Sequence, residues 1–241
     1  MSAPVAAKNR SAASIDAEQL VLKSDQGHPV TVCYKITTLT GTLKKSGQDQ
    51  KLTLPDKGET VIANFQEGKA IFSVNGKQLG DNEASVLGAL IELNDAKTAS
   101  DDDACYGSTD RKKVGEHWKV DPQAVARELA KKSMVTAPDN VDGSVTFVQV
   151  KDVAGAPAIR LALDVNVKGM TLPLPDMVKV DSSTVHVTGG IIVPVDPNGP
   201  GLAEQTKLEM VANLSINQNG QSVKITSTDS LFKEASTLPV K

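Results

Sequence analysis

The sequence predicts a mainly β fold (α+β) with two short helices, in which antiparallel meanders form a curled sheet or a sandwich. Three observations favour this class. Apolar and polar residues alternate over several segments, turn-forming pairs such as Asn75-Gly76 separate them, and only two stretches show helical spacing. The 241-residue chain has four Phe, two Tyr and one Trp, so its core must be built mainly from aliphatic side chains.

The first third of the chain is predicted to be a meander of strands. In residues 28–43, Val30, Val32 and Ile36 would lie on one face of a strand and Cys33 on the other. Residues 61–65 and 70–74 alternate in the same way, and Asn75-Gly76 supplies the positive φ angles of a tight turn. These strands would form a sheet with one covered face.

Two stretches carry helical spacing. Between residues 81 and 94, Asp81 and Asn82 are candidate caps for a short helix whose apolar side consists of Val86, Leu87, Leu90 and Ile91. Asp121-Pro122 begins the second helix, with a carboxylate cap followed by proline at the first helical position. This helix is predicted to end at about Ser133.

The second half of the chain is predicted to form long strands. Residues 159–167 and 208–216 alternate without interruption between apolar and polar side chains. Residues 145–150 should form a hairpin with the first of these, and residues 223–225 with the second. A further strand over residues 185–195 should be bent or bulged at Gly189-Gly190.

The apolar faces of these strands need a cover, and two short helices supply only part of it. We therefore expect either a second packed sheet or a strongly curled sheet that encloses the helices. Residues 1–15 are predicted to be a flexible N-terminal segment, and residues 16–95 an N-terminal β meander with a short helix. Residues 96–241 would hold a junction helix and a long-stranded C-terminal β meander, either as a second domain or as part of one continuous domain.

The composition argues against two classes of partner. A net charge of −3 and scattered aromatic residues do not favour nucleic acid. No apolar run reaches the roughly 18 residues of a transmembrane helix. Residues 1–14 contain Lys8 and Arg10 without a following apolar stretch, so no signal peptide is present, but the Ala/Ser-rich start resembles a segment that follows a cleavage site. We expect an extracytoplasmic protein, periplasmic or secreted.

The two cysteines, Cys33 and Cys105, lie far apart and outside any metal-ligand spacing. They form either one long-range disulfide or two free thiols, and the sequence leaves both alternatives open. The acidic run at residues 101–103 offers oxygen ligands for a cation, with Asp101 and Asp103 as weak candidates. The run lacks the alternating ligands and closing Glu of a calcium loop, so a solvated acidic loop is favoured.

No catalytic or cofactor signature is present in the sequence. There is no G-x-S-x-G motif, no Gly-rich phosphate loop and no H-E-x-x-H motif, so we name no catalytic residues and expect no cofactor. The single indole, Trp118, comes just ahead of the helix cap at Asp121. A structural anchor in the core is favoured for it over a residue on a ligand or partner surface.

One part of the chain resembles a known kind of protein. Its motifs are an acidic pair followed by glycine in residues 102–107, Val-Gly-Glu-His-Trp at residues 114–118, a short helix, and a strand starting at residues 143–145. These residues resemble exported bacterial β-rich proteins of uncharacterised function, and the resemblance covers roughly residues 96–163. It implies an envelope location and a structural role for Trp118, and it carries no catalytic residues.

The leading hypothesis for function is a non-enzymatic extracytoplasmic binding or scaffold protein, whose partner would be a protein or an apolar small molecule. A first alternative is a carrier of lipid or another apolar ligand in a curled sheet. Its ligand surface would consist of Leu161, Leu163, Leu208 and Met210. A second alternative is a hydrolase whose site is assembled from residues far apart in the sequence.

Overall fold

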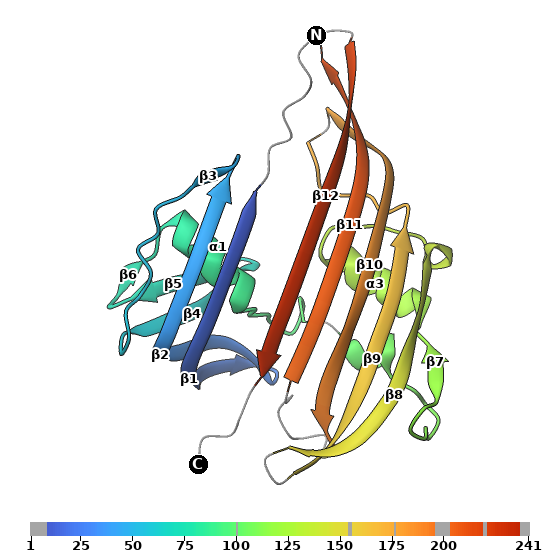
Figure 1. The fold of residues 1–241 in the computed structure, drawn as a ribbon, viewed down its shortest axis with the longest axis horizontal. Helices are drawn as coiled ribbons and strands as arrows, with labels where there is room; N and C mark the ends of the chain where they lie inside the picture. The colour runs from blue at the N-terminus through green and yellow to red at the C-terminus, as the bar shows by residue number, and fades with distance from the viewer. Residues whose placement is uncertain are drawn as a thin grey trace. The chain divides into compact units, whose positions relative to one another are not determined.

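The computed structural model describes residues 9–99, 101–153, 156–175, 177–195, 203–218 and 221–236. The chain divides into two compact units, Met1–Ala99 (unit 1) and Ser100–Lys241 (unit 2). Each unit has its own antiparallel sheet and its own hydrophobic core. The two are therefore described separately (Figure 1).

Unit 1 is a sheet with the strand order β1-β2-β4-β5-β6, and β3 pairs with β2 beside this path. Two-residue turns with positive φ angles join neighbouring strands, among them Glu67-Gly68 and the predicted Asn75-Gly76. The elements are β1 (Arg10–Asp25), β2 (His28–Lys45), β3 (Gln48–Asp49), β4 (Thr60–Gln66), β5 (Lys69–Val74), β6 (Lys77–Gln78) and helix α1 (Asp81–Leu90).

The core of unit 1 lies between this sheet and α1. Its sheet side comes from alternate residues of β2, β4 and β5, as the alternation predicts, and its helix side includes Leu87. α1 contacts β1, β2 and β5. The buried members of this cluster are Val32, Ile36, Val61, Ala63, Phe72, Leu87, Ile91 and Leu93.

Unit 2 is a sheet with the strand order β12-β11-β10-β9-β8-β7, in which each strand pairs antiparallel with its neighbours. The strands are β7 (His117–Lys119), β8 (Val141–Val153), β9 (Ala156–Lys168), β10 (Val178–Pro194), β11 (Ala203–Gln218) and β12 (Gln221–Ser236). The helices are α2 (Asp102–Tyr106), α3 (Pro122–Lys131) and the 3₁₀ turn η1 (Pro138–Asn140).

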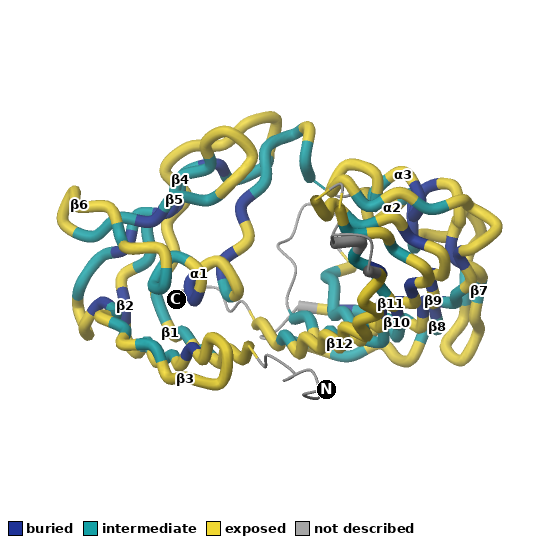
Figure 2. Tube along the Cα trace, turned by 90° about the horizontal axis from the view of Figure 1, so that it is seen from above, coloured by how far each residue is buried: buried dark blue, intermediate teal, exposed yellow. Residues whose placement is uncertain are grey.

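Helices α2 and α3 cover one face of the unit 2 sheet, and in Figure 1 α3 lies behind the strands. α3 begins as predicted, because an Asp121 carboxylate oxygen accepts hydrogen bonds from the backbone N–H groups of Gln123 and Ala124 at 2.8 and 3.0 Å. Val125 of α3 and Cys105 of α2 pack on Val145 and its neighbours. Figure 2 shows the buried stretch of α3 in dark blue.

The prediction of a mainly β, antiparallel fold is confirmed. The alternative of one strongly curled sheet around the helices is wrong, because the strands form two separate open sheets. Each of these sheets has its own helix against its apolar face. The described residues also contain three short α-helices rather than two, since Asp102 and Asp103 of the acidic run begin helix α2, which ends at Tyr106.

Strand β1 was not predicted from the sequence. Residues 10–15, which were predicted to belong to a flexible segment, form the start of this strand. β1 is an edge strand with only Ala13, Ile15 and Ala17 half-buried, and three register shifts break its pairing with β2, so its apolar residues do not alternate regularly. The boundary between the units falls after Ala99, whereas the sequence analysis placed it after residue 95.

The helices of the described ranges are α1, α2, α3 and the short turn η1. None of the helices there combines the length and the apolar character that crossing a bilayer requires.

Candidate binding groove

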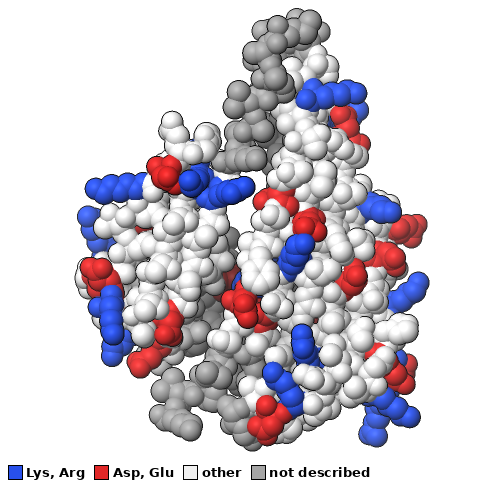
Figure 3. Space-filling view, viewed as in Figure 1, with Lys and Arg blue, Asp and Glu red and all other residues white. Residues whose placement is uncertain are grey.

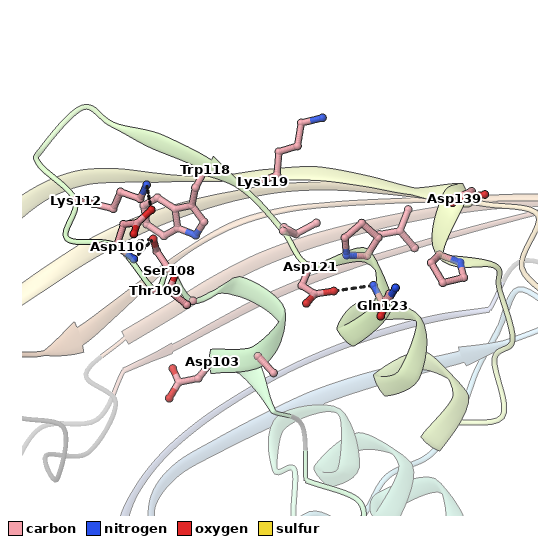
Figure 4. Close-up of a pocket in the computed structure, with 16 residues that line it drawn as sticks. Asp103, Ser108, Thr109, Asp110, Lys112, Trp118, Lys119, Asp121, Gln123 and Asp139 are labelled. Carbon is pink, nitrogen blue, oxygen red and sulfur yellow. Dashed lines mark hydrogen bonds and ion pairs between the residues drawn. The ribbon is translucent and has the colours of Figure 1, made fainter.

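A groove lined by described residues of unit 2 runs past α2, β7, the start of α3 and η1 (Figure 4). Its volume is about 1120 Å³, and it is open to solvent along one side. Most of its lining comes from one continuous part of the chain, residues 103–123, and the rest from residues 138–141. The groove therefore depends on the packing of η1 beside α3.

The α2 side of the groove is fixed by backbone hydrogen bonds. The Asp101 carboxylate accepts from the backbone N–H of Ala104 at 3.0 Å and caps the helix. The helix ends at Gly107, whose N–H donates to the Asp103 carbonyl at 2.9 Å. A Cβ at position 107 would overlap that carbonyl oxygen, so the turn into the groove requires glycine.

Trp118 joins the groove to the core. β7 holds its backbone opposite Val145 of β8, and its indole Nε1 donates to the Tyr106 carbonyl at 2.8 Å. The ring is half-buried against the core of unit 2, and the Lys112 Nζ lies 6.0 Å from the ring centroid. The indole is thus both an anchor of the fold and part of the groove surface.

The groove carries more acidic than basic side chains. Asp121 is occupied by capping α3, and Asp110 lies 4.0 Å from the Lys112 ammonium. Figure 4 shows Lys119 on the opposite side of its strand from the Asp121 carboxylate. The charged residues of the lining are Asp103, Asp110, Asp121, Asp139, Lys112 and Lys119.

The Ser108 hydroxyl of the groove is held within a turn. Ser108 Oγ donates to the Asp110 carbonyl at 3.1 Å and accepts from the Asp110 N–H at 3.2 Å, so this hydroxyl stabilises a turn. The described residues that line the groove include no histidine or cysteine that could act as a base or nucleophile beside it.

Two ionisable residues of α2, Cys105 and Tyr106, contribute to the core of unit 2, and Glu128 of α3 acts on both electrostatically. Burial, together with a smaller contribution from the nearby Glu128 carboxylate, raises the pKa of the Cys105 thiol to about 11. Burial likewise raises the pKa of the Tyr106 hydroxyl to about 12. Glu128 lies 2.9 Å from the Lys131 ammonium through Oε2. Cys105 is therefore a protonated core residue at neutral pH and not an activated nucleophile.

Of the two weak cation candidates, Asp103 lines the groove and Asp101 is not among its lining residues. Asp101 is used as a helix cap, and Asp103 is exposed on the first turn of α2. No group of three or more His, Cys, Asp or Glu side chains in the described ranges is arranged to hold a metal ion.

The four residues of the predicted apolar ligand surface lie on neighbouring parts of one sheet face. Leu161 and Leu163 belong to β9, and Leu208 and Met210 belong to β11. All four are half-buried and pack against the core of unit 2. None of them lines the Trp118 groove, nor the smaller groove of about 310 Å³ between the β4–β5 hairpin and α1 in unit 1.

The two cysteines lie in different units, Cys33 in β2 and Cys105 in α2. Both are free thiols in the structure, Cys33 half-buried and Cys105 buried. The predicted alternative of a disulfide is therefore not supported.

Comparison with known proteins gave no relative from which function could be transferred. No family model, curated protein or solved structure matches this chain. The resemblance to exported β-rich proteins therefore stays a prediction. The sequence analysis missed Asp110, Lys112 and Asp139 as groove residues. The only available signal was the density of polar residues around Trp118.

Proposed function

We propose that this protein is a non-enzymatic binding protein whose ligand occupies the groove beside Trp118. One observation carries the proposal. A groove of about 1120 Å³ combines the only indole of the chain with charged side chains held by α2, β7, α3 and η1. An aromatic ring with a few convergent polar groups on rigid elements is typical of a ligand site.

The charges of the groove favour a cationic ligand. Asp103 and Asp139 are exposed, and Lys119 lies on the other side of its strand from Asp121. Lys112 already lies over the ring of Trp118 and near Asp110. The remaining carboxylates would favour a positively charged ligand, because an approaching cation meets more acidic than basic groups.

The single tryptophan makes the test direct, because all indole fluorescence of the protein comes from Trp118. Titration with trilysine should change that emission saturably, and maltotriose serves as an uncharged probe of similar size. Asp103→Asn and Asp139→Asn should each weaken trilysine binding, roughly three- to ten-fold for the loss of one charge contact.

Asp142→Asn is the matched control, because Asp142 is exposed on β8 and does not line the groove. It changes the net charge by the same amount and should leave binding unchanged. If maltotriose binds and trilysine does not, the groove is still the binding site, but the proposal that its ligand is cationic is wrong. No change of Trp118 emission with any probe, or an equal effect of Asp142→Asn, would argue against the site itself.

The proposal includes an extracytoplasmic location. It rests on the resemblance of the region around Trp118 to exported proteins and on the Ala/Ser-rich composition of residues 2–14. Fractionation of the native host should recover the protein with periplasmic or secreted marker proteins. Recovery with cytoplasmic markers would contradict this part of the proposal without affecting the groove.

The alternative of an apolar carrier has weaker support. It requires Leu161, Leu163, Leu208 and Met210 to face a cavity, whereas all four pack against the unit 2 core. Native mass spectrometry of protein purified without detergent distinguishes the two functions. A retained adduct that organic solvent removes would favour the carrier.

A further inference from the structure

The last strand of unit 2, β12, is a long edge strand with an open backbone. Among the described strands it pairs only with β11, from Ala203 opposite Ser236 to Gln218 opposite Gln221, and no bulge interrupts this register. Its described side chains are all exposed except Lys233, which is half-buried. A long, regular edge presents unpaired N–H and C=O groups and is a template for another strand.

Both faces of β12 also present apolar side chains. Ile225 and Leu231 lie on the same sheet face as the core residues, opposite Leu214 and Leu208 of β11, and are 41% and 47% exposed. Phe232 lies on the other face and is 62% exposed. The apolar face of the sheet therefore continues to its edge, where a further strand would cover these side chains.

The other long edge strand, β1 in unit 1, has an irregular register, whereas that of β12 is regular, and this difference favours β12 as the pairing edge. Three register shifts break the pairing of β1 with β2, between Asp16 and Ala17 and on both sides of Lys23. Bulges of this kind twist an edge away from further pairing. Residues 221–236 of β12 contain no bulge, no proline and no glycine.

We propose that β12 pairs antiparallel with β12 of a second copy of this chain, about a two-fold axis that passes through Thr228. Two copies would then share one continuous sheet, and because the same strand serves both copies, the assembly closes at a dimer. This inference is independent of the groove. The expected partner is a second copy of the chain, because β12 is complementary to itself.

The backbone restricts the registers that such a pairing can use. Gln218 lies opposite Gln221 across a two-residue connection, and this closing pair of a hairpin is hydrogen-bonded. Hydrogen-bonded pairs alternate along an antiparallel ladder, so odd-numbered residues of β12 bond to β11. Even-numbered residues from Ser222 to Glu234 direct their N–H and C=O groups to the free edge, and two copies must pair through these.

Side-chain complementarity then selects the register among the three most central ones. With the axis at Thr228, Ile225 faces Leu231 of the second copy, and this pair occurs twice. These are non-hydrogen-bonded positions, where facing side chains approach most closely. An axis at Asp229 would place two carboxylates opposite each other, and an axis at Ser227 would place Ile225 opposite Asp229.

The charged residues of β12 agree with the same register. Lys224 would face Phe232, Lys233 would face Val223, and Glu234 would face Ser222 of the second copy. No like charges are opposed. On the visible face of unit 2, Figure 3 shows basic and acidic side chains interspersed, so no large area of one sign opposes the approach of a second copy.

Sedimentation of the wild-type protein over a range of concentrations should show a species of twice the 25.3 kDa chain mass. Ile225→Glu and Leu231→Lys, each at an exposed position, should weaken the dimer by about ten-fold or more, because each change places a charge against an apolar side chain twice. Thr228→Pro should also weaken it, since it removes an N–H of the free edge while leaving the ladder to β11 intact.

The double variant Ile225→Glu with Leu231→Lys tests the register itself. Each introduced carboxylate would face an introduced ammonium of the second copy, so dimerisation should return toward the wild-type level. Leu20→Glu on the exposed β1 edge is the matched control and should leave the dimer unchanged. Circular dichroism verifies that each variant is folded. A wild-type chain that stays monomeric at every concentration, or a double variant that dimerises no better than the single ones, would overturn the proposal.

Discussion

At the residue scale, Trp118 shows how one side chain can belong to the core and to a surface. Its Nε1 is bonded to the Tyr106 carbonyl at 2.8 Å, and its ring packs on the core cluster of unit 2. The ring also lines the groove beneath Lys112. This partly buried hydrogen bond fixes the indole, so a ligand would meet a ring that is already oriented, and little entropy would be lost on binding.

The raised pKa values of Cys105 and Tyr106 predict a loss of stability in alkaline solution. In the folded state the pKa of the Cys105 thiol is about 11, whereas its ordinary value is 9.0. Burial of the neutral thiol therefore stabilises the fold fully below pH 9, and this contribution is lost as the pH rises from 9 to 11. Tyr106 acts in the same direction from pH 10 to about 12.

Urea unfolding midpoints measured between pH 7 and pH 12 test this expectation. The wild-type midpoint should fall steeply above pH 9, and Cys105→Ala should show a shallower fall between pH 9 and 11. Cys33→Ala is the control, because Cys33 is half-buried in unit 1 and its removal should leave the pH profile of the wild type. Parallel profiles for Cys105→Ala and the wild type would contradict the assignment to Cys105.

At the element scale, the adjacent glycines of β10 are not equivalent. A Cβ on Gly189 would lie 2.5 Å from the backbone oxygen of Gln205, in β11, whereas a Cβ on Gly190 would lie 3.4 Å from the Leu161 oxygen. Strand β11 must therefore move to accommodate Gly189→Ala. This variant should lose about 1–3 kcal/mol of unfolding free energy.

Gly190→Ala is the matched variant, with the same chemical change one residue away. It should be within about 1 kcal/mol of the wild type, and it can stabilise the protein by restricting the unfolded chain. Urea unfolding followed by circular dichroism gives both values. Equal losses of unfolding free energy in the two variants would show that any alanine in this part of β10 is destabilising. The close contact of residue 189 with β11 would then not be the cause.

The elements that the sequence predicted are those with a local physical signal. Asp121-Pro122 starts a helix through its own cap chemistry, and the long strands alternate because one face is buried. β1 was not predicted because it is an exposed edge strand with bulges. α2 was not predicted because an acidic run is equally typical of a loop. The groove was not predicted from the sequence, because Asp139 is brought beside residues 103–123 only by the packing of η1 beside α3.

At the scale of the whole molecule, two separate cores predict two independent folding units. Each sheet carries its own helix on its apolar face, and the two buried clusters share no residue. A domain can fold alone when its core is complete within its own chain segment. Residues 1–99 and residues 100–241 should therefore each fold when produced separately, with dispersed amide resonances in two-dimensional NMR spectra.

A third fragment, residues 141–241, sharpens this prediction. It retains the long strands β8 to β12 but lacks α2 and α3, which bury Val145, Val165 and Val185 from one side. With that apolar face uncovered it should aggregate or stay unfolded, whereas residues 100–241 should unfold cooperatively. If residues 100–241 fail to fold while the full chain does, unit 2 needs unit 1 for its stability. If residues 141–241 fold as well as residues 100–241, the helices are dispensable and the sheet is stabilised by its strands alone.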